Sequence, residues 1–420
     1  MSQLAAVLFW LLAALTLAQA ALVIRFLIAL ARFRRTLLTD ADCPRAAVVL
    51  CLRGTDPFLR RCLEAILDQD YPRFELRIVI DHPSDPSHSV VDDVIARHAT
   101  TNVDVQDLLI PRGDCSLKCS SLVQAITTSD ESIEIFAQLD ADVIPHRTWL
   151  RELATALADP RTAAATGNRW YVPQTTTIGS LVRYCWNAAA VVQMYSYEIA
   201  WGGSLGIKAS AIREAGLIER WSRAFCEDTM LFRVLSEKGW QTAFVPSLMM
   251  INAETCDLGS FRRWVQRQLL TARLYHPRWF AVLLHGWGTT LVPACAVILL
   301  VAMVVRQSEF TIGWLAAGLV MYETSLFLLL LPIDWLVRRI ARARNERYRR
   351  FNFTDLAKLL FAVPLTQLVY PRALLAAMCM RYVEWRGVAY EVSGPWDIRL
   401  VQYQPFETAD EVSAASTASL

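Results

Sequence analysis

The feature that most constrains this chain is the placement of its long uncharged stretches. Residues 4–24 and 279–305 carry no charge, and residues 311–333 carry only Glu323. Each stretch is long enough to cross the roughly 30 Å hydrocarbon core of a bilayer as one helix. Since 54% of the 420 residues are hydrophobic, the chain can also build a soluble core between these stretches. We therefore expect an integral, multi-pass membrane protein with a soluble middle.

The basic residues that follow these stretches predict the side of the membrane on which the middle lies. Arg25, Arg32, Arg34 and Arg35 follow the first stretch, and seven arginines lie between residues 338 and 350 after the third. Loops rich in Lys and Arg stay in the cytosol. The alternative is a signal peptide cleaved near residues 18–20, but no basic residue precedes the apolar run. We expect the N-terminus outside and the middle in the cytosol.

The chain divides into seven parts. Pro364 and Pro371 interrupt the last apolar segment, which can therefore span the membrane, re-enter it or lie at its surface, so the side of the C-terminus stays open. The parts are an N-terminal transmembrane anchor (1–35), a soluble domain (45–260), an interfacial helix (261–278), a transmembrane hairpin (279–335), a basic cytosolic loop (338–355), a third C-terminal hydrophobic or re-entrant segment (356–380) and a C-terminal tail (381–420).

The soluble middle alternates short apolar runs with amphipathic stretches. Residues 46–52 precede 57–67, residues 76–81 precede 90–98, and residues 133–139 precede 147–157. This rhythm is typical of βαβ units and predicts an α/β fold with a mainly parallel sheet flanked by helices. In such sheets, ligands bind beyond the carboxyl ends of the strands.

Polar residues lie where the expected strands end. Arg53, Asp81 and the pair Asp140 and Asp142 follow three of them, and Lys118 opens a helical stretch. Two aspartates two residues apart project from the same side of an extended chain, so both can reach one ligand. Such a pair suits Mg²⁺ or Mn²⁺, with substrate phosphates completing the coordination shell. A solvated turn is the alternative, but apolar residues flank the pair on both sides.

A second acidic pair, Glu227 and Asp228, opens an amphipathic stretch that continues to Trp240. Acids at the start of a helix can simply complement its dipole, and they can also provide a general base. The residues alone leave both readings open.

Composition excludes other classes of function. The 42 basic and 40 acidic residues give a net charge of +2, which is too small for a nucleic-acid partner. The ten cysteines, from Cys43 to Cys379, form no CxxC pair and no Cys/His cluster at zinc spacing. We expect them to be reduced and mostly buried thiols.

The motifs in combination resemble a known family. Their order is similar to that of the family-2 glycosyltransferases of GT-A fold, closest to the ceramide glucosyltransferase-like branch. The resemblance covers residues 45–275 and extends loosely to Tyr390. The stretches that carry it are LRGTDPFL from Leu52, IDHPSDPS from Ile80, SLKCSSL from Ser116, the turn Trp201-Gly202-Gly203-Ser204, and the anchor with its hairpin.

The resemblance implies a donor site for a UDP-sugar. By position, Asp81 would contact uracil and ribose, and Asp140 would lie against the nucleotide. Asp140 and Asp142 would hold Mg²⁺ or Mn²⁺ at the diphosphate, and Lys118 and Arg53 would add positive charge.

The resemblance also implies the reaction and the acceptor. Asp228 would act as general base in an inverting transfer of a sugar, most simply glucose, to a membrane lipid. A processive polysaccharide synthase and an inactive membrane scaffold are the alternatives. A synthase needs a polymer channel, for which three or four spans are few, and a scaffold would be expected to lose the acidic pairs.

The acceptor side is the least defined part of the resemblance, because the family's QxxRW signature is altered. One register uses Arg263 and Trp264, and the other begins at Arg267 or Gln268 and has Leu270 and Thr271 where Arg and Trp are expected. The same segment reads as an interfacial helix whose apolar residues face lipid. The expected acceptor-side residues are Trp201, Gly203, Glu227, Arg263, Trp264, Arg267 and Gln268.

Overall fold

The computed structural model of the chain describes residues 2–32, 36–98, 102–307 and 309–406. Arg34, Arg35 and the end of the expected tail, residues 407–420, lie outside these ranges. The described elements are α1 (Ser2–Arg32), β1 (Ala46–Leu52), α2 (Leu59–Leu67), β2 (Phe74–Ile80), α3 (Ser87–His98), β3 (Val103–Asp107), α4 (Leu117–Thr127), β4 (Ile135–Leu139), α5 (Trp149–Leu157), β5 (Thr162–Tyr171), α6 (Ile178–Tyr197), β6 (Ser204–Lys208), α7 (Ala209–Glu214), α8 (Leu217–Trp221), α9 (Leu231–Ser236), β7 (Gln241–Asn252), α10 (Leu258–Tyr275), α11 (Trp279–Val305), α12 (Glu309–Ala343), α13 (Phe353–Cys379), β8 (Tyr382–Trp385), β9 (Val388–Gly394) and β10 (Asp397–Gln402).

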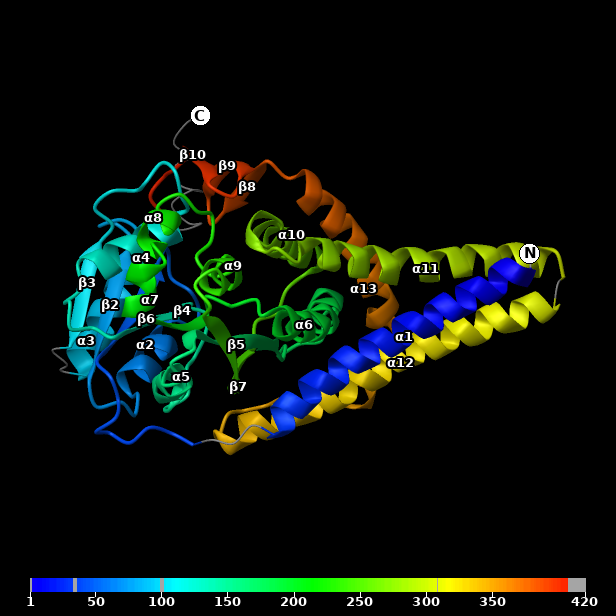
Figure 1. Cartoon of the computed structure of the whole chain (residues 1–420), viewed down its shortest axis with the longest axis horizontal. Helices are drawn as coiled ribbons and strands as arrows, with labels where there is room; N and C mark the ends of the chain where they lie inside the picture. Colours follow the sequence, from blue (N-terminus) through cyan, green and yellow to red (C-terminus); the bar gives the residue numbers. More distant parts are fainter. Residues whose placement is uncertain (1, 33–35, 99–101, 308, 407–420) are drawn as a thin grey trace, which may run out of the picture.

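A seven-stranded sheet with the order β3-β2-β1-β4-β6-β5-β7 forms the centre of the soluble domain (Figure 1). The strands pair in parallel except at β6, which is antiparallel to both of its neighbours. In the register of the central strands, Val48 lies between Leu76 and Ala137. The architecture expected from the sequence, a mainly parallel sheet flanked by helices, is confirmed.

The sequence explains why these elements form where they do. β4 is buried at every position, as expected of a strand covered on both faces. In α2 the buried residues Leu59, Cys62, Leu63 and Ile66 recur at the spacing of one helix face. The strands and helices expected before and after Arg53, Asp81 and Asp140 therefore lie within a few residues of their predicted bounds.

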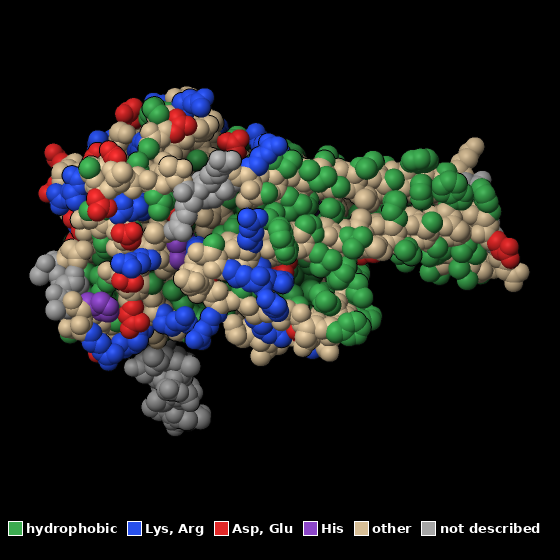
Figure 2. Space-filling model, turned by 90° about the horizontal axis from the view of Figure 1, so that it is seen from below, with side chains coloured by type: hydrophobic (Ala, Val, Ile, Leu, Met, Phe, Trp, Pro, Cys, Tyr) green, Lys and Arg blue, Asp and Glu red, His purple; other side chains and the backbone are tan. Residues whose placement is uncertain are grey.

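Among the described residues, four helices are long and apolar enough to cross a membrane: α1, α11, α12 and α13. We call the first three the shaft, because they lie along one another and project away from the sheet (Figure 1). The shaft is almost wholly hydrophobic on the face that Figure 2 shows, whereas Lys and Arg side chains gather on the soluble domain beside it. This distribution indicates association with a membrane.

Helix α13 is arranged differently, because it runs across the shaft and not along it (Figure 1). Near its start, Asp355 accepts a hydrogen bond of 2.9 Å from the hydroxyl of Thr176, which precedes α6. At its end, the carbonyl of Ala377 accepts a bond of 2.7 Å from Arg273 of α10. Pro364 and Pro371 lie inside the helix without ending it. Both ends of α13 are therefore bound to parts of the chain that border the soluble domain.

The expectation of a C-terminal tail over residues 381–420 was wrong for its first half. Strands β8, β9 and β10 form an antiparallel sheet there. Val388, Tyr390, Val392 and Ile398 are buried at alternate strand positions. The Tyr390 hydroxyl accepts a hydrogen bond of 3.1 Å from the backbone N–H of Leu117, so the sheet packs against the start of α4. The alternating apolar pattern of these strands is too short to predict them by periodicity alone.

A buried acid ties α5 to β7 and gives a prediction for stability. Glu152 is 2% exposed and accepts hydrogen bonds from His146 (3.0 Å), Thr148 (2.7 Å) and Ser247. Burial opposes its charge, but these donors outweigh burial and lower its pKa to about 2. A carboxyl whose pKa is lower in the folded state adds stability above its ordinary pKa of 4.5, and that stability is lost as pH falls toward 2.

We therefore expect Glu152→Gln to lower the free energy of unfolding by about 2–3 kcal/mol at neutral pH. The difference from the unsubstituted protein should shrink as pH falls from about 4.5 toward 2. Thermal unfolding of both proteins in detergent, measured at neutral pH and at about pH 3, checks this. An equal difference at both pH values would contradict it.

Candidate active site

A cavity of about 560 Å³ extends from the carboxyl ends of β1, β2 and β4 to the shaft. Tyr322 of α12 and Gln367 of α13 line its far end. Of the residues predicted from the sequence, Arg263 is the exception that does not line it, since its side chain is exposed and bonds Ser260. The predicted residues that do line the cavity are Arg53, Asp81, Lys118, Asp140, Asp142, Trp201, Gly203, Glu227, Asp228, Trp264, Arg267 and Gln268.

Asp140 and Asp142 follow β4 and share one cation, Arg169 of β5. The Arg169 Nη2 lies 3.0 Å from Asp140 Oδ2 and 3.4 Å from Asp142 Oδ1. Lys118 Nζ donates to the other oxygen of Asp140 at 2.7 Å. The amide of Asn252 lies 3.4 Å from Asp142 Oδ2. The two carboxylates thus lie side by side at the edge of the sheet, as their spacing predicts.

The two aspartates differ in their readiness to ionise. Burial opposes the charge of both. At Asp140 the charges of Lys118 and Arg169 outweigh burial, and its pKa is lowered. At Asp142 burial prevails over Arg169, and the negative charge of Asp140 adds to it, so its pKa is raised. An additional cation beside Asp142 would therefore be favourable.

The carboxylates fit a hard divalent cation by their chemistry. Their oxygens are the ligands that Mg²⁺ and Mn²⁺ prefer. The described residues contain no group of three or more His, Cys, Asp or Glu side chains arranged to hold a metal ion, so further ligands would have to come from substrate phosphates and water. Because Arg169 bridges both carboxylates, its side chain must give way to an ion placed between them.

The second acidic pair lies on the turn before α9, and Lys118 links it to the first pair. Glu227 forms an ion pair of 2.7 Å with Lys118, and burial raises its pKa although Lys118 partly offsets this. Asp228 Oδ2 accepts a hydrogen bond of 2.8 Å from the backbone N–H of Gly202. Its Oδ1 accepts a hydrogen bond of 2.6 Å from the backbone N–H of Thr229. A Cβ on Gly202 would lie 1.9 Å from Glu227, so only glycine allows this approach. No salt bridge to Asp228 is found among the described residues.

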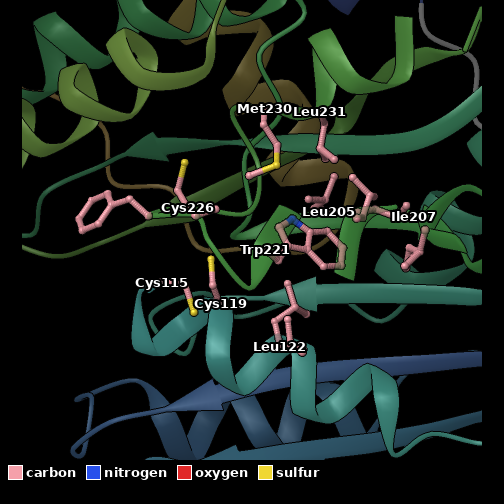
Figure 3. Close-up of a cluster of buried hydrophobic side chains, with 14 of the residues drawn as sticks. Cys115, Cys119, Leu122, Leu205, Ile207, Trp221, Cys226, Met230 and Leu231 are labelled. Atoms are coloured by element: carbon pink, nitrogen blue, oxygen red, sulfur yellow. The ribbon is translucent and has the colours of Figure 1, made fainter. Parts of the chain in front are cut away.

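A cluster of buried hydrophobic side chains supports the turn that carries the acidic pair. Figure 3 shows Cys226, the residue before the pair, close to Cys115 and Cys119 at the start of α4, with Trp221 beside Leu205 and Ile207 of β6. The indole N–H of Trp221 donates to the carbonyl of Glu227 at 3.0 Å. Rigid support of this kind keeps a polar group at a defined position.

Beyond the carboxyl ends of β1 and β2, Arg53 forms an ion pair with Asp81. Asp81 is 2% exposed, and burial raises its pKa although Arg53 opposes the shift. The C-terminal sheet covers this pair, because Arg53 also donates to the carbonyls of Arg386 (2.9 Å) and Gln404 (2.8 Å). Gly54, with φ +71°, lies so close to the Phe406 ring that a Cβ would be 2.5 Å from it.

Helix α10 places residues of both QxxRW-like registers at the cavity, Trp264 from the first and Arg267 and Gln268 from the second. The expectation that the apolar face of this helix contacts lipid was wrong for Phe261 and Leu269, which are 1% and 4% exposed. They are buried because α10 packs against α6 and α13.

Two residues of the site escaped the sequence analysis. Arg169 lies within a strand, where a cation followed by Trp170 and Tyr171 forms no motif of its own. A charge in an otherwise buried strand is nevertheless a signal for a polar site. Arg386 lies in the segment read as a tail, and it lines the cavity.

A mainly parallel sheet with paired carboxylates at its strand ends, joined to a hydrophobic shaft, defines a membrane-associated α/β protein. The chain belongs to glycosyl transferase family 21, whose family model matches residues 8–395. This confirms the resemblance to the ceramide glucosyltransferase branch.

Curated relatives match over short stretches. Ceramide glucosyltransferase of Komagataella phaffii is 31% identical over 65 residues, which are 16% of this chain and 13% of that protein. Ceramide glucosyltransferase of Candida albicans is 35% identical over 60 residues, which are 14% and 11%. The match thus spans only about an eighth of each relative's length.

Solved structures are similar at low identity. The mannosyltransferase PcManGT from Pyrobaculum calidifontis, in complex with GDP-Man and Mn²⁺, is 16% identical with a TM-score of 0.48, over 89% of this chain and 99% of that one. Glucosyl-3-phosphoglycerate synthase from Mycobacterium tuberculosis, with Mn²⁺, UDP and glucosyl-3-phosphoglycerate, is 12% identical with a TM-score of 0.38, over 57% and 86%.

Proposed function

We propose that this protein is an inverting glycosyltransferase that transfers glucose from UDP-glucose to a lipid of the membrane. The observation that carries the proposal is a single cavity that Asp140, Asp142 and Asp228 line at one end and residues of the membrane helices line at the other. Chemistry on a lipid headgroup requires this continuity, since the acceptor lies in the bilayer and the nucleotide in water.

The donor half of the site uses residues at the strand ends. Asp81 Oδ1 is buried without a hydrogen-bond partner among the described residues, which suits an incoming N–H of uracil. Asp140 and Asp142 would hold Mg²⁺ or Mn²⁺, which supplies positive charge against the leaving diphosphate. Lys118 adds a further cation at 2.7 Å from Asp140.

Asp228 is the proposed general base. The acceptor hydroxyl attacks C1 of the sugar, the bond from C1 to the diphosphate oxygen breaks, and UDP leaves with the electron pair. The proton of the hydroxyl passes to the Asp228 carboxylate. One displacement on an α-linked donor gives a β-glycoside, and no covalent intermediate with the protein is formed. The bonds from Gly202 and Thr229 hold the carboxylate in place for this step.

The acceptor would approach from the shaft. Trp201, Trp264 and Gln268 line the cavity between Asp228 and the membrane helices, and we assign them to the acceptor side with Gly203, Glu227 and Arg267. The polar side chains of Gln193 and His285, which share a hydrogen bond of 2.7 Å, lie farther along the same cavity. A lipid with polar groups near its reacting hydroxyl would fit this lining.

We propose that the catalytic domain is cytosolic and that three helices, those of the shaft, cross the membrane. Arg25 and Arg32 at the end of α1 and the arginines at the end of α12 support this orientation. The hydrogen bonds at both ends of α13 support a helix that lies at the membrane surface. A spanning helix would have its two ends on opposite sides of the membrane, whereas both ends of α13 contact parts of the chain that border the soluble domain. The C-terminal sheet would then lie in the cytosol.

Transfer in a defined bilayer tests the proposal. The full chain in lipid nanodiscs would be incubated with Mn²⁺, UDP-glucose labelled in the sugar, and either ceramide or diacylglycerol, and the lipids analysed by mass spectrometry. We expect one hexose on one of these lipids, in β configuration, and no product in EDTA. A polymeric product would favour a processive synthase, and absence of both transfer and UDP-glucose hydrolysis would favour an inactive scaffold.

A further inference from the structure

In the turn between β8 and β9, one residue has a backbone conformation that is unfavourable for a residue with a side chain. Arg386 and Gly387 connect the two strands, with φ values of 50° and 72°. Two-residue hairpin turns with positive φ at both positions are of type I′, and they strongly prefer Asn-Gly. An arginine in the left-handed region is strained. Residues held in such conformations cluster at active sites and ligand-binding sites.

The guanidinium of Arg386 lies at the mouth of the cavity, over the loop that follows β1. It donates to the carbonyl of Arg53 at 2.7 Å and forms an ion pair of 3.3 Å with Asp56. Its side chain is still 42% exposed, and it lines the cavity together with Trp385. Its positive charge also helps to lower the pKa of Asp140.

Positive charge is concentrated around this turn. Arg267 of α10 lies over the Trp385 ring at 5.1 Å and has no salt bridge among the residues that the structure describes. Burial, together with the charges of Arg169 and Arg386, lowers its pKa to about 10. Cations that repel one another in a cavity favour an anion of more than one charge between them.

We propose that Arg386 binds the diphosphate of the donor, so that the C-terminal sheet forms one wall of the donor site. This inference rests on the proposed function, because it assumes a nucleoside diphosphate in the cavity. A diphosphate can compete with Asp56 for the guanidinium, since a fork of N–H donors binds phosphate oxygens in two places. The favourable free energy of diphosphate binding then offsets the backbone strain at Arg386.

The turn offers an unusually clean test. Arg386→Asn removes the charge and creates the Asn-Gly pair that a type I′ turn prefers, so the hairpin should keep its shape. We expect the dissociation constant of UDP to rise about ten- to a hundredfold, as loss of a charged hydrogen bond implies. The dissociation constant of uridine, which has no phosphate, should not change. The temperature of unfolding should stay the same or rise.

The measurements would use the full chain in nanodiscs with Mn²⁺, by calorimetric titration. Arg386→Lys should retain part of the UDP affinity, and Arg399→Asn, an exposed arginine on β10 of the same sheet, should retain all of it. Unchanged UDP affinity in Arg386→Asn would overturn the inference. So would an equal loss for UDP and uridine with a lower unfolding temperature, which would make Arg386 a structural tie. If the unsubstituted protein binds neither UDP nor UDP-glucose, the proposed function itself fails.

Discussion

Replacing Asp228 with Asn is expected to lower the turnover of sugar transfer by about 10²–10⁴-fold, the usual contribution of a general base. The amide oxygen can accept only one of the two hydrogen bonds that Gly202 and Thr229 donate, but the bond from Trp221 to the carbonyl of Glu227 remains, so the turn before α9 should be preserved. UDP affinity should be unchanged, because the proposed role of Asp228 is to accept the proton of the acceptor. Initial rates with saturating UDP-glucose, together with UDP titrations, check both statements.

The control for this substitution is Asp92→Asn. Asp92 lies on α3 of the same domain, is exposed, and does not line the cavity. Its replacement should leave the rate unchanged. If Asp228→Asn transferred glucose at the unsubstituted rate, another group would have to accept the proton.

Asp142→Asn should have the second large effect, through the divalent cation. A neutral amide cannot balance the charge of Mn²⁺ as a carboxylate does, so we expect Mn²⁺ affinity to fall and transfer to drop by about a hundredfold or more. The side chain keeps its size, and its contact with Asn252 can persist. Electron paramagnetic resonance of Mn²⁺ titrated into protein with UDP measures the affinity directly.

Uridine binding should survive Asp142→Asn, because no phosphate or metal takes part in it. Asp92→Asn again serves as the control for a lost surface carboxylate. Equal Mn²⁺ affinity in the variant and the unsubstituted protein would remove Asp142 from the proposed ligands. Asp140→Asn would then be the next variant to examine, since Asp140 shares Arg169 with it.

Strands β1, β2 and β4 could be predicted from the sequence because each is an apolar run that precedes a helical stretch, as β1 and α2 illustrate. The path of α13 could not be predicted from the sequence. Its length and hydropathy are those of a spanning helix, and only tertiary bonds, such as that of Asp355 to Thr176, place both ends near the soluble domain. Local composition has no information about such contacts.

The same distinction holds within the site. Asp140 and Asp142 were detectable because two acids interrupt an apolar run, which is costly without a ligand or a partner. Arg169 is their partner, but it lies on a strand two positions away in the sheet, across β6. Arg386 is farther still in sequence, and its role depends on how the small sheet packs. Which residues contact one another across the fold depends on its topology, and the spacing of residues along the sequence does not predict such contacts.

The continuity of the cavity with the shaft has a consequence for kinetics. If the acceptor enters between the helices, it need not leave its leaflet, and only its reacting hydroxyl has to reach Asp228. The quantity that governs the rate is then the mole fraction of acceptor in the surrounding bilayer, and not its concentration in the total volume. Diluting the acceptor with inert lipid should slow the enzyme, whereas adding water to the same vesicles should not.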